Sequence, residues 1–267
     1  FEGFISEGGG EYMLDLASDV DLCHVAIPKR GEGDHIDLNI YLVGVRGMDA
    51  DSAAGDRDLQ RALDRFEDIY GQVGVRLGQV RYYDLDEDQA AFHSTVRSQE
   101  QAHQLVTLSE APGDTVDEQL SVNVFLIEAF SMGGGGVLGI SSGLPGAAGV
   151  HGTRGSGLVF SAVTRNDADL FGQVLAHEVG HYLGLPHTTE QGGSTMDPFE
   201  DTPTCRRINR QGDDCPDAGN LMFPFAGSDR ADISDGQALA MQANPLLKGD
   251  DTTVLPGEEE RDDDDDD

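Results

Sequence analysis

Residues 177–187 read His-Glu-Val-Gly-His-Tyr-Leu-Gly-Leu-Pro-His, and no other stretch of the chain is as informative about fold and chemistry. His177 and His181 are four residues apart, so a helix with about 3.6 residues per turn places both imidazoles on one face. Gly184 allows a sharp turn after the helix, because glycine adopts positive φ at little cost. That turn brings His187 back towards the pair. The pattern predicts a Zn²⁺ site with three protein ligands and a fourth position open to water.

Glu178 follows the first histidine and is expected beside the metal rather than among its ligands. Bound zinc lowers the pKa of its water towards ~7, and a nearby carboxylate can accept the proton as that water attacks a carbonyl. We therefore expect a zinc-dependent endopeptidase with Glu178 as general base. The alternative is a catalytically silent, calcium-stabilised binding module that retains the zinc site.

Hydrophobic periodicity predicts a sheet before the histidine-bearing helix and one further helix after it. Strands are expected at 36–45, 75–83, 121–127 and 158–163, and helices at 56–70, 168–183 and 234–243. Residues 96–108 suit an exposed helix or a loop, and 186–228 are rich in Gly, Asp and Pro and expected to be irregular. The glycine-rich segment 133–157 is the expected source of an edge strand, or its rim, along which an extended substrate would pair.

The 177–187 stretch resembles the metzincin clan of zinc metalloproteases. In that clan a methionine-containing turn passes under the metal, and residues 220–224 (Asn-Leu-Met-Phe-Pro) look like it, with Met222 the methionine. Met196 is a rival, but it follows His187 so closely that little chain is left to pass beneath the site. The resemblance implies an α+β fold: a twisted mixed sheet with an active-site helix above an irregular C-terminal subdomain that ends in a helix.

Within the clan, residues 197–203 (Asp-Pro-Phe-Glu-Asp-Thr-Pro) look most like a calcium-binding segment of the pappalysin family. The resemblance implies Ca²⁺ held by Asp197, the Phe199 carbonyl, Asp201 and Thr202, and hard oxygen donors in a flexible loop suit that ion. A solvated acidic turn is the alternative. Pro224 departs from the family, which has tyrosine there, and the resulting Met-x-Pro pattern is more like the matrix metalloproteases.

The expected organisation has four parts: an N-terminal extension that resembles a pro-segment (1–34), an N-terminal subdomain with the sheet and zinc helix (35–187), a C-terminal subdomain with the methionine turn (188–248), and a disordered acidic tail (249–267). Cys23 in the first part is a candidate latency ligand, because a thiolate is an avid zinc ligand and several metzincin pro-segments use one this way. A buried or intermolecularly paired thiol is the alternative for Cys23.

Charge and cysteine content limit the partners and the compartment. The net charge of −33 includes −10 from residues 249–267, and such a field disfavours nucleic acid and favours cations and basic peptides. Solubility or tolerance of salt is the alternative reading of this charge. The expected partners are protein or peptide substrates. No apolar run is long enough to span a bilayer. Cys205 and Cys215 are close together in a loop, so a disulfide is expected, with two reduced thiols as the alternative. The disulfide would fit a protein that is secreted or exposed at the cell envelope; the oligomeric state is left open.

Overall fold

The computed structural model describes residues 33–132, 136–190, 193–205 and 214–249. Nearly all of the extension expected at 1–34, including Cys23, and of the acidic tail expected at 249–267 lies outside these residues. The four-part division of the chain therefore stays a prediction.

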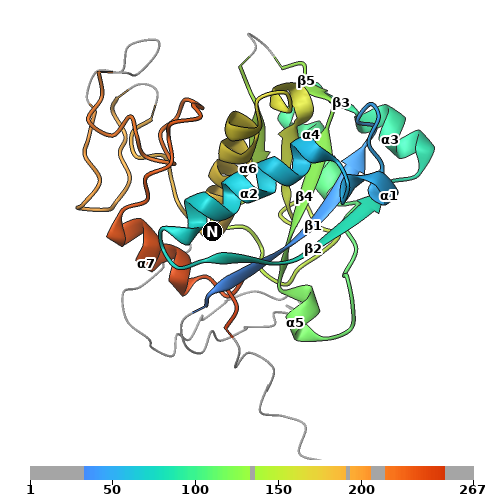
Figure 1. The fold of residues 1–267 in the computed structure, drawn as a ribbon, viewed down its shortest axis with the longest axis horizontal. Coiled ribbons are helices and arrows are strands. Elements are labelled where there is room, and N and C mark those ends of the chain that lie inside the picture. Colours follow the sequence, from blue (N-terminus) through green and yellow to red (C-terminus); the bar gives the residue numbers. More distant parts are fainter. Residues whose placement is uncertain (1–32, 133–135, 191–192, 206–213, 250–267) are drawn as a thin grey trace, which may run out of the picture.

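A five-stranded sheet forms the centre of the fold (Figure 1). The strand order is β2 (Arg76–Asp84), β1 (His35–Val43), β4 (Ser121–Ile127), β7 (Leu158–Ser161) and β6 (Gly139–Ser141). All neighbours are parallel except β6, which runs antiparallel to β7 at the edge of the sheet. The short strands β3 (Thr95–Val96) and β5 (Ala129–Phe130) pair separately. The four predicted strands are confirmed.

The described helices are α1 (Ala50–Ala53), α2 (Arg57–Gly71), α3 (Glu87–His93), α4 (Gln99–Val106), α5 (Val116–Gln119), α6 (Ala168–Leu183) and α7 (Asp235–Ala243), with a 3₁₀ turn at Ala162–Thr164. The three long helices expected from periodicity are present, and the open region at 96–108 contains α4 as a helix. Each of these three helices starts after an N-cap residue of the expected type. The side chains of Asp56, Asp167 and Ser234 each accept hydrogen bonds from free backbone N–H groups of the first turn.

Both faces of the sheet are covered at its centre, so every residue of strand β4 is buried, including the polar Ser121 and Asn123. Alternate residues of β1 and β4 pack on one face against α2 and α6, in a core that includes Phe66, Phe171 and Tyr182. The other residues of these strands, such as Phe125, pack against α4 on the opposite face. Helix α6 is therefore held between the sheet, α2 and the chain that follows it (Figure 1).

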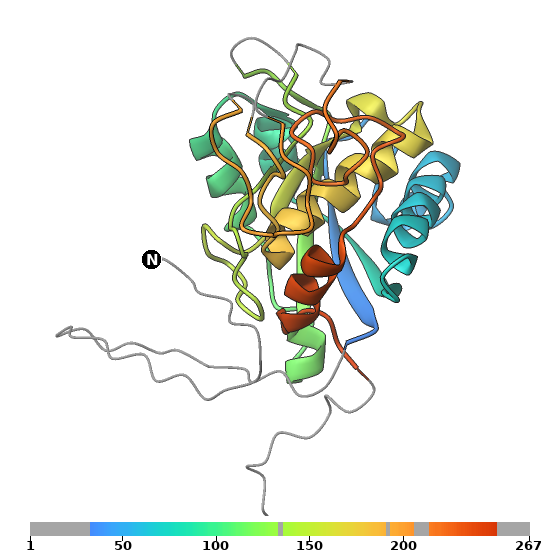
Figure 2. The ribbon, with the colours of Figure 1, turned by 90° about the vertical axis from the view of Figure 1, so that its left-hand side faces the viewer.

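The described parts of the irregular segment between α6 and α7 lie beside α6 (Figure 2). After α7 the chain returns to β1, where the backbone of Lys248 pairs with that of His35 and its ammonium lies 2.9 Å from the Asp37 carboxylate. The α+β architecture with a mixed sheet, a histidine-bearing helix and an irregular part ending in a helix is confirmed. No described helix combines the length and the apolar character that crossing a bilayer requires.

Candidate metal centre

The three histidines of the 177–187 stretch converge on one point. Helix α6 ends at Gly184, whose φ of 106° lies in the left-handed region that glycine favours, and its N–H bonds the carbonyls of Gly180 and His181. The reversal brings His187 back to the helix, so that ligand atoms of His177, His181 and His187 all lie within 4.8 Å of one another. The spacing argument thus predicts the geometry of the cluster.

Backbone carbonyls orient the imidazoles of α6. The Nδ1–H of His177 donates to the Leu221 carbonyl and that of His181 to the Leu185 carbonyl, each at 2.7 Å. Because a carbonyl only accepts, both rings carry their proton on Nδ1 and present an Nε2 lone pair to the centre. The third ring, His187, has Glu190 Oε1 3.3 Å from its Nδ1.

The donor set fits a tetrahedral cation. Nε2 of His181 lies 3.1 Å from Nε2 of His187, and two lone pairs that close repel unless a positive charge lies between them. Ligands at the Zn–N distance of about 2.0–2.1 Å on a tetrahedral ion are spaced by roughly 3.4 Å. Burial lowers the pKa of His177 to about 4 and that of His181 well below its usual value, so both rings are neutral, as metal ligands must be.

Glu178 is buried beside the three rings, against the edge strand. A Cβ added to Gly139 of β6 would lie 2.4 Å from its Oε1, so strand and carboxyl are in close contact only because residue 139 has no side chain. Burial raises the pKa of Glu178 to about 8, partly opposed by a hydrogen bond from the Ser141 backbone. A carboxyl held this way is suited to proton transfer near neutral pH.

In metal-free protein, Glu178→Gln is expected to raise the free energy of unfolding more at pH 8 than at pH 5. The folded state keeps the Glu178 proton up to about pH 8, whereas the unfolded chain releases it near 4.5. The stability contributed by the protonated carboxyl is complete below pH 4.5 and is lost as the pH rises through 8. Gln does not ionise, so the difference in free energy of unfolding between Glu178→Gln and the wild type grows from pH 5 to pH 8 by on the order of 3 kcal/mol. Urea unfolding of both proteins after chelation, at pH 5 and at pH 8, measures this difference. An equal difference at the two pH values would contradict the burial of the Glu178 carboxyl.

Met222 lies directly under α6 and is fully buried. A Cβ on Gly180 would come within 2.7 Å of its sulfur, and the Met222 carbonyl accepts from the N–H of Thr188 at 3.1 Å. The residue before Met222 is Leu221, whose carbonyl orients His177. The rival Met196 lies elsewhere, bridged to Thr189 in a short antiparallel pairing.

A cleft of about 580 Å³ opens beside the histidines. One wall is β6 and the segment around it, the other is the face of α6 that carries His177 and His181, and the turn after Met222 lines a third side. Its lining includes Gly139, Ile140 and Ser141 from β6, Gln173, Val174, His177, Glu178 and His181 from α6, and Pro224 and Ala226 from the turn.

The acidic loop expected to hold calcium is assembled only in part. The Thr202 hydroxyl donates to Asp197 Oδ1 at 2.6 Å and lies 3.0 Å from the Phe199 carbonyl, and the other Asp197 oxygen, Oδ2, is buried without a partner. The fourth predicted ligand, Asp201, is instead turned to the start of α7, where it accepts from the N–H of Gly236 and the hydroxyl of Ser234.

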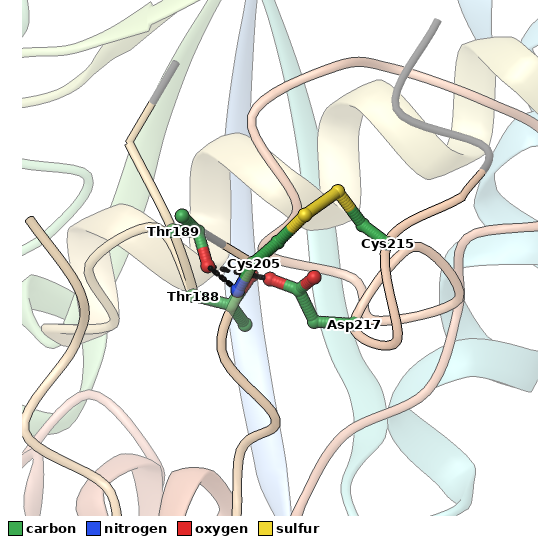
Figure 3. Close-up of a disulfide and its surroundings, with 5 residues drawn as sticks. All are labelled: Thr188, Thr189, Cys205, Cys215 and Asp217. Atoms are coloured by element: carbon green, nitrogen blue, oxygen red, sulfur yellow. Dashed lines mark hydrogen bonds between the residues drawn. A yellow bond between two sulfur atoms is a disulfide. The ribbon is translucent and has the colours of Figure 1, made fainter. Parts of the chain in front are cut away.

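Cys205 and Cys215 form the expected disulfide, which lies close to Thr188, Thr189 and Asp217 (Figure 3). Beside it, the buried Asp217 carboxylate accepts from the hydroxyls of Thr188 and Thr189, both at 2.8 Å. The N–H of Cys205 also donates to the Thr189 hydroxyl, so the residues that directly follow His187 are held beside the disulfide. The predicted latency ligand Cys23 lies outside the described residues.

Sequence reasoning expected the edge strand or its rim within 133–157, which contains β6, but it did not single out Gly139 or Ser141, and it did not identify Gln173 as a cleft residue. Strand β6 is only three residues long and has no periodicity to read. Gln173 did carry a signal, because it lies four residues before His177 and hence on the same helical face.

Comparison with known proteins adds family and fold. The family model described as Matrixin (peptidase M10) matches residues 77–221. No curated protein sequence matches. Among solved structures, mirolysin in complex with compound 9 is similar at 14% identity and a TM-score of 0.50, over 80% of this chain and 92% of that one. Metalloproteinase-II from Bacteroides fragilis has 11% identity and a TM-score of 0.47, over 80% and 54% of the two chains. Archaemetzincin from Methanopyrus kandleri has 15% and 0.40, over 79% and 88%.

Proposed function

The chain belongs to the matrixin family, and from this premise we propose that it is a zinc-dependent endopeptidase that cleaves protein or peptide chains in the cleft between β6 and α6. The observation that carries the proposal is the convergence of His177, His181 and His187 beside the buried carboxyl of Glu178. Membership of the matrixin family also confirms the prediction that the chain is a metzincin metalloprotease. The closer resemblance to the pappalysin family stays a prediction.

His177, His181 and His187 would hold the zinc, which supplies a Lewis acid and lowers the pKa of water in its open position. Glu178 accepts the proton of the attacking water and then delivers it to the leaving amine. Its position is supported by the Ser141 N–H and by the close approach of Gly139. Because it is the last strand of the sheet, β6 has one edge available for main-chain hydrogen bonds with an extended substrate.

Further parts of the proposal concern the surroundings of the site. We assign the zinc helix to an N-terminal subdomain (35–187) and the Met222 turn to a C-terminal one (188–248). Calcium binding at Asp197, Phe199 and Thr202 is supported by the buried, unpartnered Asp197 oxygen. The disulfide fits a secreted or envelope-exposed protein, and Cys23 stays a candidate for latency.

Removal of the metal is expected to abolish hydrolysis of casein, and one equivalent of zinc is expected to restore it. Calcium alone is expected to raise the melting temperature without restoring turnover, because oxygen ligands select calcium and imidazoles select zinc. Elemental analysis and a fluorogenic casein assay on the same sample measure both effects. Turnover that persists in metal-free protein would contradict the proposal. Bound zinc without cleavage of any peptide would favour the silent binding module.

A further inference from the structure

Gln173 lies on the cleft face of α6, one turn before His177. Residues 173, 177 and 181 are spaced by four and therefore form one row along the helix. The opposite face is occupied, because a Cβ on the neighbouring Gly172 would meet the Ala62 carbonyl of α2 at 2.5 Å. The row that carries the metal ligands therefore continues into the cleft as Gln173, with Val174 beside it.

The carboxamide of Gln173 is buried and has no partner. The residue is 0% exposed, and neither its Oε1 nor its Nε2 makes a hydrogen bond. Among the described residues it is the only side chain with two such atoms, and none of the other unpartnered atoms belongs to a residue that lines the cleft. A buried donor and acceptor left unpaired destabilise a folded protein, so their presence at a binding site points to a ligand that completes them.

The chemistry of the missing partner follows from the pair of free atoms. Another carboxamide offers one donor and one acceptor in the same planar arrangement and satisfies both atoms at once. An aliphatic side chain satisfies neither, and a lysine or arginine only donates, so that Nε2 stays unpaired. A carboxylate only accepts, which leaves Oε1 unpaired, and it would also enter a cleft that already contains Glu178.

We propose that Gln173 is a specificity-determining residue that selects Gln or Asn in the substrate, at a position flanking the cleaved bond. The inference rests on the proposed peptidase function and names the side chain that its cleft prefers. The flanking position follows from the place of Gln173, one helical turn from the histidine that would hold the metal. The preference differs from the one for basic residues that net charge alone suggests.

Cleavage of an unbiased peptide mixture by the zinc-loaded wild-type protein tests the inference. We expect Gln or Asn at one flanking position, with kcat/KM on the order of 100-fold above the matched Leu or Met peptide, because a site built for hydrogen bonds rejects partners that lack them. The variant Gln173→Met, which keeps the length of the side chain without its polar atoms, is expected to remove this preference and to favour Leu or Met. It is also expected to raise the melting temperature of the free protein.

Gln60 supplies the matched control. Its Nε2 donates to the Ala53 carbonyl and to the Tyr82 hydroxyl, away from the cleft, so Gln60→Met should lower the melting temperature and leave the cleavage preference unchanged. A wild-type profile without Gln or Asn enrichment overturns the inference, as does a Gln173→Met profile equal to wild type. Absence of any cleavage is a different result, because it contradicts the proposed peptidase rather than its specificity.

Discussion

Glu178→Gln is expected to lower kcat/KM for peptide hydrolysis by roughly 10³- to 10⁴-fold, the upper range of what a positioned general base contributes. Gln has the shape of Glu but cannot accept the proton of the attacking water or return it to the amine. Carbonyl groups orient His177 and His181, and Glu190 lies beside His187, so no imidazole depends on Glu178 and the zinc should stay bound. Steady-state kinetics on one fluorogenic peptide, with zinc counted in each sample, measures the effect.

The control makes the same chemical change where it should have no effect. Glu67 is exposed on α2, and Glu67→Gln should leave both kinetics and zinc content unchanged. Wild-type turnover in the Glu178 variant would refute its role as base, and a variant that has lost its zinc would show instead that the carboxyl supports the ligands. Full activity in Glu67→Gln is needed before either conclusion is drawn.

The histidine cluster could be predicted from the sequence because its geometry depends on local rules. Two histidines four apart share a helical face in any α-helix, and Gly184 ends α6 with a positive φ that few other residues adopt. The buried strands could be predicted in the same way, since apolar residues occupy all but two positions of β4. In each case the information lies within one segment.

What could not be read depends on contacts between distant segments. The Leu221 carbonyl orients His177 from 44 residues away, and a carbonyl has no signature in the sequence. Asp201 and Asp197 are the same residue type in the same loop, yet only the Asp201 carboxylate bonds to α7, because the free N–H groups at the start of a helix offer it a partner. The unpaired state of the Gln173 amide is likewise visible only once all its neighbours are in place.

The packing of the zinc helix gives the largest expected effect on stability. Gly172 lies where α6 crosses α2, and a Cβ there would come within 2.5 Å of the Ala62 carbonyl and 2.7 Å of the Arg65 Cβ. Backbone atoms cannot rotate away, so the two helices would have to separate. Gly172→Val is expected to lower the free energy of unfolding by about 3 kcal/mol or more, at the upper end of what overpacking costs.

Because α6 also carries two of the three histidines proposed to hold the zinc, the displacement should reach the site. Zinc affinity is expected to fall together with stability in Gly172→Val. Both should fall less in Gly172→Ala, since the smaller side chain also gains about 1 kcal/mol of helix propensity.

Gly71, at the end of α2, is the matched control, because its added Cβ would meet nothing within 4 Å. Gly71→Ala should therefore raise stability by roughly 0.5–1 kcal/mol. Urea unfolding and zinc titration of the three variants measure these effects, and wild-type stability in Gly172→Val would mean that α2 does not approach the zinc helix this closely.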